Sequence, residues 1–176
     1  MIFKSTLLDE NTITRSLTRI SYEIVEHTDI DNVVLVGIKT RGVPLAIEIA
    51  KNIKKNLNID VPVKDLDISL YRDDLSEIHD FPIMNNNPNF EVKDKDIILV
   101  DDVISTGRTV RAAIEAIFSL GRPKTIKLAV LVDRGHRELP IRADFVGKNI
   151  PTSKKEEVCV KLLSIDGKNC VELYER

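Results

Sequence analysis

The chain has 176 residues, 43% of them hydrophobic and 31% charged, which excludes a disordered composition and predicts one domain with a sizeable core. A formal net charge of −2 excludes a protein that coats nucleic acid through bulk positive charge, although a local basic patch remains compatible with it. No apolar run approaches the roughly 18 residues that a membrane helix needs. The first residues lack the layout of a signal peptide, because Asp9 and Glu10 follow at once.

The two cysteines, Cys159 and Cys170, are too few for a disulfide framework. Without an export signal they indicate reduced thiols, so we expect a cytoplasmic protein. The histidines are scattered through the chain, at His27, His79 and His136. We therefore expect no metal site built from His and Cys ligands.

In chain order, residues 9–27 carry one apolar stripe at spacings of three and four, which predicts a helix. The short apolar run at residues 32–36 is typical of a strand buried on both faces. Residues 43–57 again have helical spacing, with Pro44 in the first turn, where its missing N–H costs nothing. Apolar and polar residues alternate at 66–71, which predicts a half-exposed strand.

Further along, we expect a buried strand at residues 97–100, a helix at 109–120 ending before Gly121, a strand at 125–132, and two C-terminal strands at 158–163 and 171–174 joined by a turn at Asp166 and Gly167. Strands that alternate with amphipathic helices predict an α/β domain with a mainly parallel, twisted sheet and helices on both faces. Ligands of such sheets bind beyond the carboxyl ends of the strands.

The polar stretch from Arg72 to Val92 has little periodicity and contains an Asn-rich run. A surface loop without a role and a flexible lid are both compatible with this composition.

The most informative segment is residues 97–109. Four apolar residues predict a buried strand, Asp101 and Asp102 stand at its end, and a short loop with hydroxyl groups and a glycine opens a helix. Backbone N–H groups and hydroxyls at a helix N-terminus suit a phosphate monoester. Gly107 permits positive φ and a close approach of the backbone. The two carboxylates can accept hydrogen bonds from the vicinal hydroxyls of a ribose and favour positive charge on the sugar ring.

Either half of this segment alone would be an ordinary strand end or an ordinary helix cap. Joined in this order they are far more specific, and the chain has neither a Walker Gly-Lys-Ser/Thr loop nor a dinucleotide Gly-rich turn. The segment is similar to the phosphoribosyl-diphosphate motif of type I phosphoribosyltransferases. The loop at residues 37–42, directly after the first buried strand, resembles the pyrophosphate loop of that family.

Three more segments, residues 70–75, 132–144 and 147–152, resemble the family of pyrimidine operon attenuation regulators that also have uracil phosphoribosyltransferase activity. The resemblance extends essentially over the whole chain and is weakest at residues 80–89. It implies the type I phosphoribosyltransferase fold over residues 1–176 as a single domain, with a small C-terminal β hood and a flexible lid at about residues 71–92.

The resemblance implies a pentosyl transfer, a glycosyltransferase reaction in which uracil and phosphoribosyl diphosphate give UMP and diphosphate. Asp101, Asp102 and Arg41 are the expected catalytic residues. The expected substrate-binding residues are Thr40, Arg41, Asp101, Asp102, Val103, Ile104, Ser105, Thr106, Gly107, Arg108 and Thr109, with Arg134 and the Val158 backbone at the nucleobase. Mg²⁺ is the implied cofactor, bound mainly through phosphoribosyl diphosphate and without a dedicated protein cage.

A second expectation concerns the exposed face of the helix predicted at residues 9–27. If Ile13, Leu17, Ile20 and Ile24 face inward, the opposite side presents Arg15, Thr18, Arg19 and Tyr22. Such a set is usually a solvated face, but arginine forks suit phosphates and tyrosine stacks on unpaired bases. The resemblance implies that this face, with His136, Arg137, Arg142 and Lys148, binds a leader mRNA hairpin of the pyrimidine operon when UMP or UTP occupies the active site.

Three functions are therefore compatible with the sequence. The first is an enzyme that also regulates transcription termination by binding RNA. The second is a dedicated salvage phosphoribosyltransferase for uracil or a purine base without RNA binding, and the third is a regulator that turns over poorly. The resemblance also implies a homodimer or a higher homo-oligomer.

Overall fold

The computed structural model describes residues 1–72 and 90–176, so the predicted lid at about residues 71–92 falls largely outside the described residues. In chain order the elements are β1 (Ile2–Leu8), α1 (Glu10–His27), β2 (Val33–Ile38), α2 (Gly42–Leu57), β3 (Val63–Leu66), β4 (Asp96–Ile104), α3 (Arg108–Leu120), β5 (Thr125–Asp133), β6 (Phe145–Asn149), β7 (Glu156–Lys161), α4 (Leu163–Asp166) and β8 (Cys170–Glu175). Short 3₁₀ turns lie at Ile30–Asn32 and Ser69–Tyr71.

A five-stranded parallel sheet with the order β3-β2-β4-β5-β6 forms the centre of the molecule. Every residue of β2 is buried, as are the first six residues of β4. Continuous apolar runs of this kind occur where helices cover both faces of a parallel sheet. The predicted α/β fold is confirmed.

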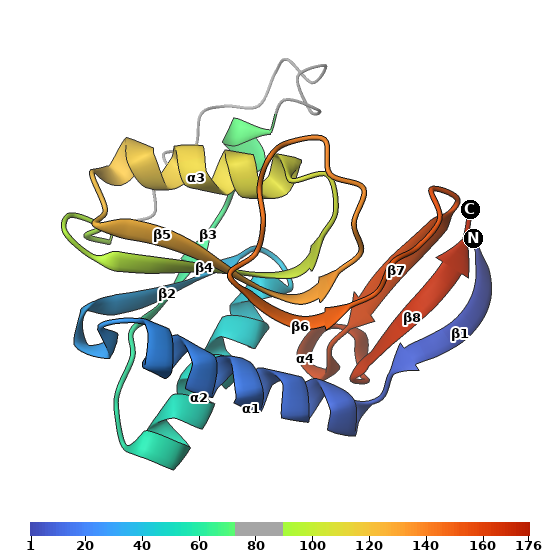
Figure 1. The fold of residues 1–176 in the computed structure, drawn as a ribbon, viewed down its shortest axis with the longest axis horizontal. Helices are drawn as coiled ribbons and strands as arrows, with labels where there is room; N and C mark the ends of the chain where they lie inside the picture. Colours follow the sequence, from blue (N-terminus) through green and yellow to red (C-terminus); the bar gives the residue numbers. More distant parts are fainter. Residues whose placement is uncertain (73–89) are drawn as a thin grey trace.

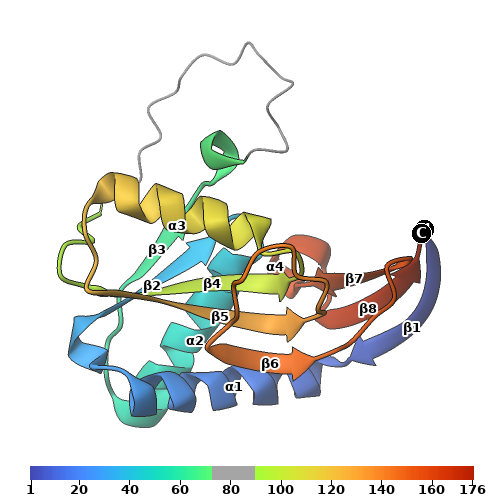
Figure 2. The same ribbon diagram turned by 45° about the horizontal axis from the view of Figure 1, so that its top comes forward.

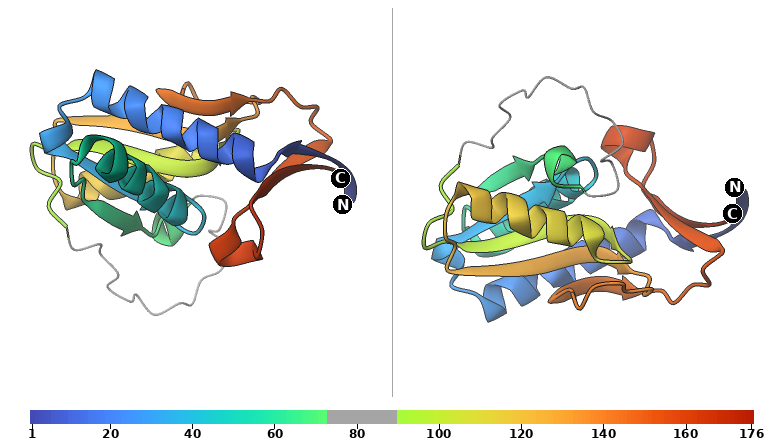
Figure 3. Two further views of the ribbon diagram at one scale, coloured as in Figure 1. Left: turned by 90° about the horizontal axis from the view of Figure 1, so that it is seen from below. Right: turned by 90° about the horizontal axis from the view of Figure 1, so that it is seen from above.

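Helices lie on both faces of this sheet, with α1 and α2 on one side and α3 on the other (Figures 1 and 3). The apolar stripe of α1, at Ile13, Leu17, Ile20 and Ile24, is buried against the first face, as predicted. Val110, Ala113 and Ile117 of α3 pack in a second apolar cluster on the opposite face. The helices therefore cover the faces of the sheet and leave the ends of its strands for loops.

A smaller antiparallel sheet, with the order β1-β8-β7, lies beyond the carboxyl ends of the parallel strands (Figure 2). It joins the first and last segments of the chain, so the two termini lie side by side (Figure 1). This sheet is the hood that the resemblance implied, and it includes β1, which the sequence analysis did not predict.

The structure differs from the sequence prediction at three further places. The strand expected at residues 66–71 ends at Leu66, because Ser69–Tyr71 forms a 3₁₀ turn in which the Tyr71 amide donates to the Ile68 carbonyl. β6 was not predicted; it pairs in parallel with β5 at the edge of the sheet. The C-terminal connection contains α4, a single helical turn that ends at Gly167 with φ of 76°, which is the position of the predicted turn.

No helix in the described ranges, 1–72 and 90–176, has the length and apolar character required to cross a membrane.

Candidate active site

The loop between β4 and α3, residues 105–107, contains the glycine with positive φ that the sequence analysis expected. Gly107 has φ of 94°, a left-handed conformation that side chains rarely adopt, and α3 begins directly after it at Arg108. Ser105 and Thr106 are half-exposed in front of this helix N-terminus, as is Thr109 in its first turn. The positive end of the α3 dipole is therefore available to an anion.

Residues 134–139 donate hydrogen bonds to the carbonyl groups in and just before this loop. The Arg134 amide donates to the Ile104 carbonyl at 3.1 Å, and the amides of Glu138 and Leu139 both donate to the Thr106 carbonyl. Arg137 donates through Nη1 to the Ser105 carbonyl at 2.9 Å. Because these carbonyls are already bonded, the loop is held in place before any phosphate binds.

Asp101 and Asp102 stand at the carboxyl end of β4, the central strand of the sheet. Asp101 Oδ1 accepts the Asp102 amide and Asp102 Oδ1 accepts the Val103 amide. Burial raises the pKa of Asp101 well above its usual value, and the neighbouring Asp102 charge adds to the rise. Burial also raises the pKa of Asp102, although the hydrogen bond from the Val103 amide and the nearby Arg41 charge act to lower it. A ligand with hydroxyl donors or positive charge would relieve this crowding of carboxylates.

The predicted pyrophosphate loop lies next to these carboxylates, because β2 and β4 are adjacent and parallel. α2 begins at Gly42, where a Cβ atom would lie 2.2 Å from the Val100 carbonyl oxygen, so only glycine allows this approach. Thr40 is exposed, whereas Arg41 is half-buried and donates through Nη2 to Asp166 of α4 at 2.8 Å. The structure thus brings Thr40, Arg41 and the Asp pair to one edge of the sheet.

The two residues expected at the nucleobase lie on different segments: Arg134 directly follows β5, and Val158 is in β7. The Arg134 guanidinium donates to the Glu156 carbonyl at 2.6 Å and to Thr152 Oγ1 at 3.3 Å. The Val158 side chain is 7% exposed and packs in the apolar core, so only its backbone can face a ligand. Ile104 is buried in the same way, at 2% exposed.

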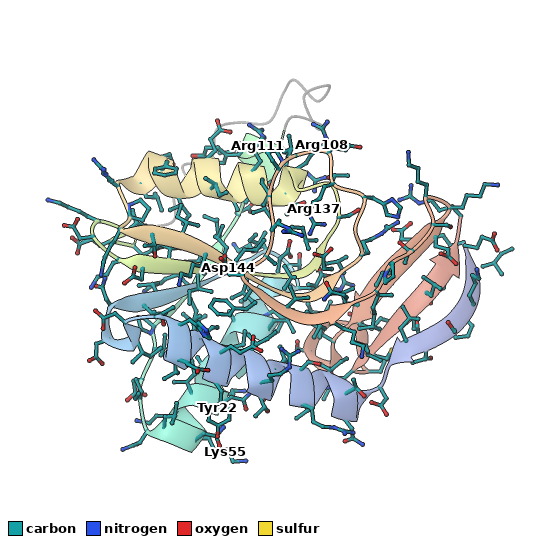
Figure 4. All side chains as sticks on the ribbon, in the orientation of Figure 1. Tyr22, Lys55, Arg108, Arg111, Arg137 and Asp144 are labelled. Atoms are coloured by element: carbon teal, nitrogen blue, oxygen red, sulfur yellow. The ribbon has the colours of Figure 1, made fainter. Side chains whose placement is uncertain are left out.

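The Arg108 side chain is paired with Glu138, because its Nε donates to Glu138 Oε2 at 2.8 Å. Figure 4 shows Arg108 and Arg111 on the outer side of α3. The Arg108 amide donates to Thr106 Oγ1 at 3.3 Å, and the side chain is bonded to Glu138.

The residues predicted to contact RNA fall into two groups in the structure. On α1, Arg15, Arg19 and Tyr22 are exposed and Thr18 is half-exposed. Arg19 has partners of its own: Nη2 donates to the carbonyls of Val146 and Gly147, at 3.0 and 2.6 Å, and Nη1 pairs with Glu23. Arg19 therefore bonds α1 to β6, at the edge of the sheet.

The second group lies around the segment of residues 134–139. Arg142 and Lys148 are exposed, but the Arg137 guanidinium is bonded to Asp133, the Ser105 carbonyl and the Ile141 carbonyl. His136 has φ of 63°, and its ring pairs with the Thr152 carbonyl at 2.7 Å. Figure 4 shows Arg137 near the start of α3 and Tyr22 on the opposite side of the sheet. Lys148 connects the two groups along the chain, because it follows Gly147, whose carbonyl accepts the bond from Arg19.

Sequence reasoning missed the partners that orient the predicted side chains, among them Glu156, Asp166 and Thr152. Glu156 and Asp166 are separated from Arg134 and Arg41 by 22 and 125 positions, and no local pattern marks them. Their role follows from the hood, whose first strand was not predicted.

Comparison with known proteins agrees with this geometry. Residues 4–165 match the family model of the phosphoribosyl transferase domain. "Bifunctional protein PyrR" of Clostridioides difficile is 56% identical over 99% of this chain and 100% of the relative. The protein of the same name from Acetivibrio thermocellus is 57% identical over 99% of this chain and 96% of the relative. This chain therefore belongs to the phosphoribosyltransferase family and, within it, to the family of the bifunctional PyrR proteins.

Solved structures with the same fold include hypoxanthine phosphoribosyltransferases. The enzyme of Trypanosoma cruzi superposes with a TM-score of 0.75 at 16% identity, covering 98% of this chain and 97% of its own. A hypoxanthine-guanine phosphoribosyltransferase of Bacillus anthracis gives a TM-score of 0.73 at 18% identity, covering 98% of each chain. At such identities the likeness concerns the fold alone.

Proposed function

We propose that this protein transfers the phosphoribosyl group of phosphoribosyl diphosphate to uracil, giving UMP and diphosphate. We also propose that it binds the leader mRNA of the pyrimidine operon, in a manner that depends on UMP or UTP, to promote transcription attenuation. The observation that carries the proposal is a pair of carboxylates on β4 followed directly by a loop at the N-terminus of α3. The carbonyl groups of this loop accept hydrogen bonds from residues 134–139. Reactants of this kind occur inside cells, which supports a cytoplasmic location, and a homodimer remains part of the proposal.

In such a transfer the bond from the anomeric carbon to diphosphate breaks while the bond to uracil forms, so the ring gains positive charge and the leaving group negative charge. The helix N-terminus at residues 105–109 would hold the 5′-phosphate, and the Asp101 and Asp102 carboxylates would hold the ribose hydroxyls. Arg41 and Thr40 would receive the diphosphate. Holding both reactants in line and stabilising opposite charges is the main work left for the protein.

Mg²⁺ suits this site, because it prefers oxygen ligands and keeps several waters. Within residues 1–72 and 90–176, no cluster of three or more His, Cys, Asp or Glu side chains could enclose a metal ion. Each Asp uses Oδ1 for a backbone amide, so Oδ2 of Asp101 and Asp102 would be the protein's contribution. When bound, the ion would neutralise part of the diphosphate charge.

The Asp102→Asn variant tests the enzymatic part. It removes a carboxylate at the ribose while preserving the size of the side chain, so we expect turnover of uracil to fall by roughly 100-fold or more. Steady-state kinetics with each free base, uracil and the purines, would measure the loss and separate a uracil enzyme from a purine salvage enzyme. Asp96→Asn, at the other end of β4, is the matched control, and undiminished turnover in Asp102→Asn would refute the ribose assignment.

An electrophoretic shift assay on a leader hairpin, with and without UMP, tests the regulatory part. Linkage requires that a nucleotide that tightens RNA binding is itself bound more tightly by the RNA complex. Arg19→Ala and Tyr22→Ala should each weaken RNA binding, and Arg19→Ala should lower the salt slope if Arg19 contacts a phosphate. Tyr22→Ala is the cleaner variant, because Arg19 also bonds β6.

Lys51→Ala, at an exposed position on α2, is the control for general loss of positive charge. Unchanged RNA affinity in both α1 variants, with UMP present, would leave the dedicated salvage enzyme as the better account.

A further inference from the structure

The turn of residues 153–156, which leads into β7, connects the first strand of the chain to Arg134. Glu156 accepts a hydrogen bond from Lys4 Nζ of β1 at 2.6 Å through Oε1. Its Oε2 accepts the Ser153 amide at 2.8 Å, while its own amide donates to the Ser153 carbonyl. One carboxylate therefore closes the turn and attaches it to β1.

The backbone of this turn orients the Arg134 guanidinium. Nη2 of Arg134 donates to the Glu156 carbonyl at 2.6 Å, and Nε donates to Thr152 Oγ1 at 3.3 Å. Neither acceptor is a carboxylate, so these bonds fix the direction of the guanidinium without neutralising its charge. An arginine held in this way keeps its remaining N–H donors for a planar ligand with carbonyl oxygens.

We propose that Glu156 is a positioning residue for the nucleobase: it fixes the 153–156 turn, and through the Glu156 carbonyl it sets the direction of Arg134. This inference rests on the proposed function, in which Arg134 meets the base. It goes further by naming the residue that decides how precisely uracil is held. Glu156 itself does not contact the reacting atoms.

The charge of Glu156 is permanent under assay conditions. The hydrogen bond from Lys4 and the amide of Ser153 lower the pKa of Glu156 to about 2. The positioning contact is therefore constant across neutral pH, and pH profiles of the wild type should show no titration from this group.

Steady-state kinetics on Glu156→Ala and Glu156→Gln test the proposal. Glu156→Ala opens the turn, and because misplacing a binding group by about 1 Å can cost up to 100-fold, we expect a rise in the KM for uracil of roughly tenfold. The KM for phosphoribosyl diphosphate and kcat should stay within about twofold, because a loss of binding that is equal in the ground state and the transition state raises KM alone. Glu156→Gln keeps an oxygen for the Ser153 amide but weakens the Lys4 contact, so a smaller rise is expected.

Glu157→Gln is the matched control, because Glu157 is the next residue of β7 and also pairs with a cation of the hood, Arg176, at 2.9 Å. It should leave the KM for uracil unchanged. Thr152→Val removes the second Arg134 contact and provides an independent variant should Glu156→Ala not fold. Thermal melting of each variant separates loss of folding from loss of uracil binding.

A parallel rise in both KM values, or a KM for uracil equal to that of Glu157→Gln, would overturn the positioning role. Wild-type turnover of uracil tests the proposed function, whereas the ratio of variant to wild-type KM tests Glu156. Normal wild-type turnover with an unchanged ratio therefore refutes only the role of Glu156.

Discussion

The two sheets of this molecule are stabilised in different ways. In the five-stranded parallel sheet, β2 is buried throughout, and apolar clusters on both faces hold it in place. In the hood, β1 is exposed over most of its length. Val158, Val160 and Val171 of the hood join the apolar core, and ion pairs also join its strands to each other and to the site. The Glu172 side chain, at 5% exposed, pairs with Lys161 and accepts hydrogen bonds from Lys168 and Tyr174.

This difference divides the site into two kinds of support. The β4–α3 loop and the carboxylates stand on the rigid sheet, whose close packing tolerates little movement. Arg41 and Arg134 are oriented by polar contacts from the hood, to Asp166 and to the Glu156 carbonyl. In the proposed function, the sugar phosphate would meet groups held by the packed sheet, whereas the diphosphate and the base would meet side chains oriented by polar contacts with the hood.

The largest effect is expected where the rigid sheet allows no adjustment. In Gly42→Ala the new Cβ would lie 2.2 Å from the Val100 carbonyl oxygen, so α2 or β4 must shift. Overpacking of this kind costs about 1–3 kcal/mol, which corresponds to a fall in Tm of roughly 2–12 °C. Differential scanning calorimetry measures it, with the exposed Lys51→Ala on the same helix as control; an unchanged Tm would show that the sheet is less rigid than its packing indicates.

As the pH falls, the hood should lose stability before the five-stranded sheet does. Hydrogen bonds from Lys161, Lys168 and Tyr174 lower the pKa of Glu172 far below its ordinary value of 4.5. Because the folded-state pKa is lowered, this stabilisation is present above about pH 4.5 and is lost as the pH falls further.

Hydrogen exchange at pH 7 and pH 3.5 should therefore show β7 and β8 losing protection while β4 keeps it. In Glu172→Gln, β7 and β8 should lose hydrogen-exchange protection already at pH 7, and their protection should depend much less on pH. Equal protection of both sheets at pH 3.5 would contradict the division between them.

The smallest effect is a gain in stability from Asp101→Asn. Because the folded-state pKa of Asp101 is raised, stability is lost as the pH rises above the ordinary carboxyl pKa of 3.8, and an amide avoids this loss. We expect Tm to rise by about 2–4 °C at pH 8, the change that 1 kcal/mol makes in a domain of this size, and by less at pH 5.

Asp96→Asn, at the amino end of the same strand, should have the opposite sign. Burial alone would raise the pKa of Asp96, but hydrogen bonds from Thr125 and Asn32 outweigh it, so the net shift is downward. A gain in Tm for both variants would mean that any loss of charge on β4 is stabilising.

The sequence predicted most of the parallel sheet, because long buried strands and amphipathic helices have strong periods. It missed β1, whose residues are mostly exposed and do not alternate, and β6, a short strand at the edge of the sheet. The strand expected at residues 66–71 was wrong because the chain turns at Ser69–Tyr71 after β3 ends.

By itself the sequence determined the β4–α3 loop and its two carboxylates, since all their parts are neighbours in the chain and local spacing decides how they lie. Only the tertiary structure decided which partners orient Arg41, Arg134 and Arg137, and that Arg19 bonds β6. These contacts join residues as far apart as Lys4 and Glu156, 152 positions along the chain. No local period records such a contact, because it exists only once the two sheets have been packed against each other.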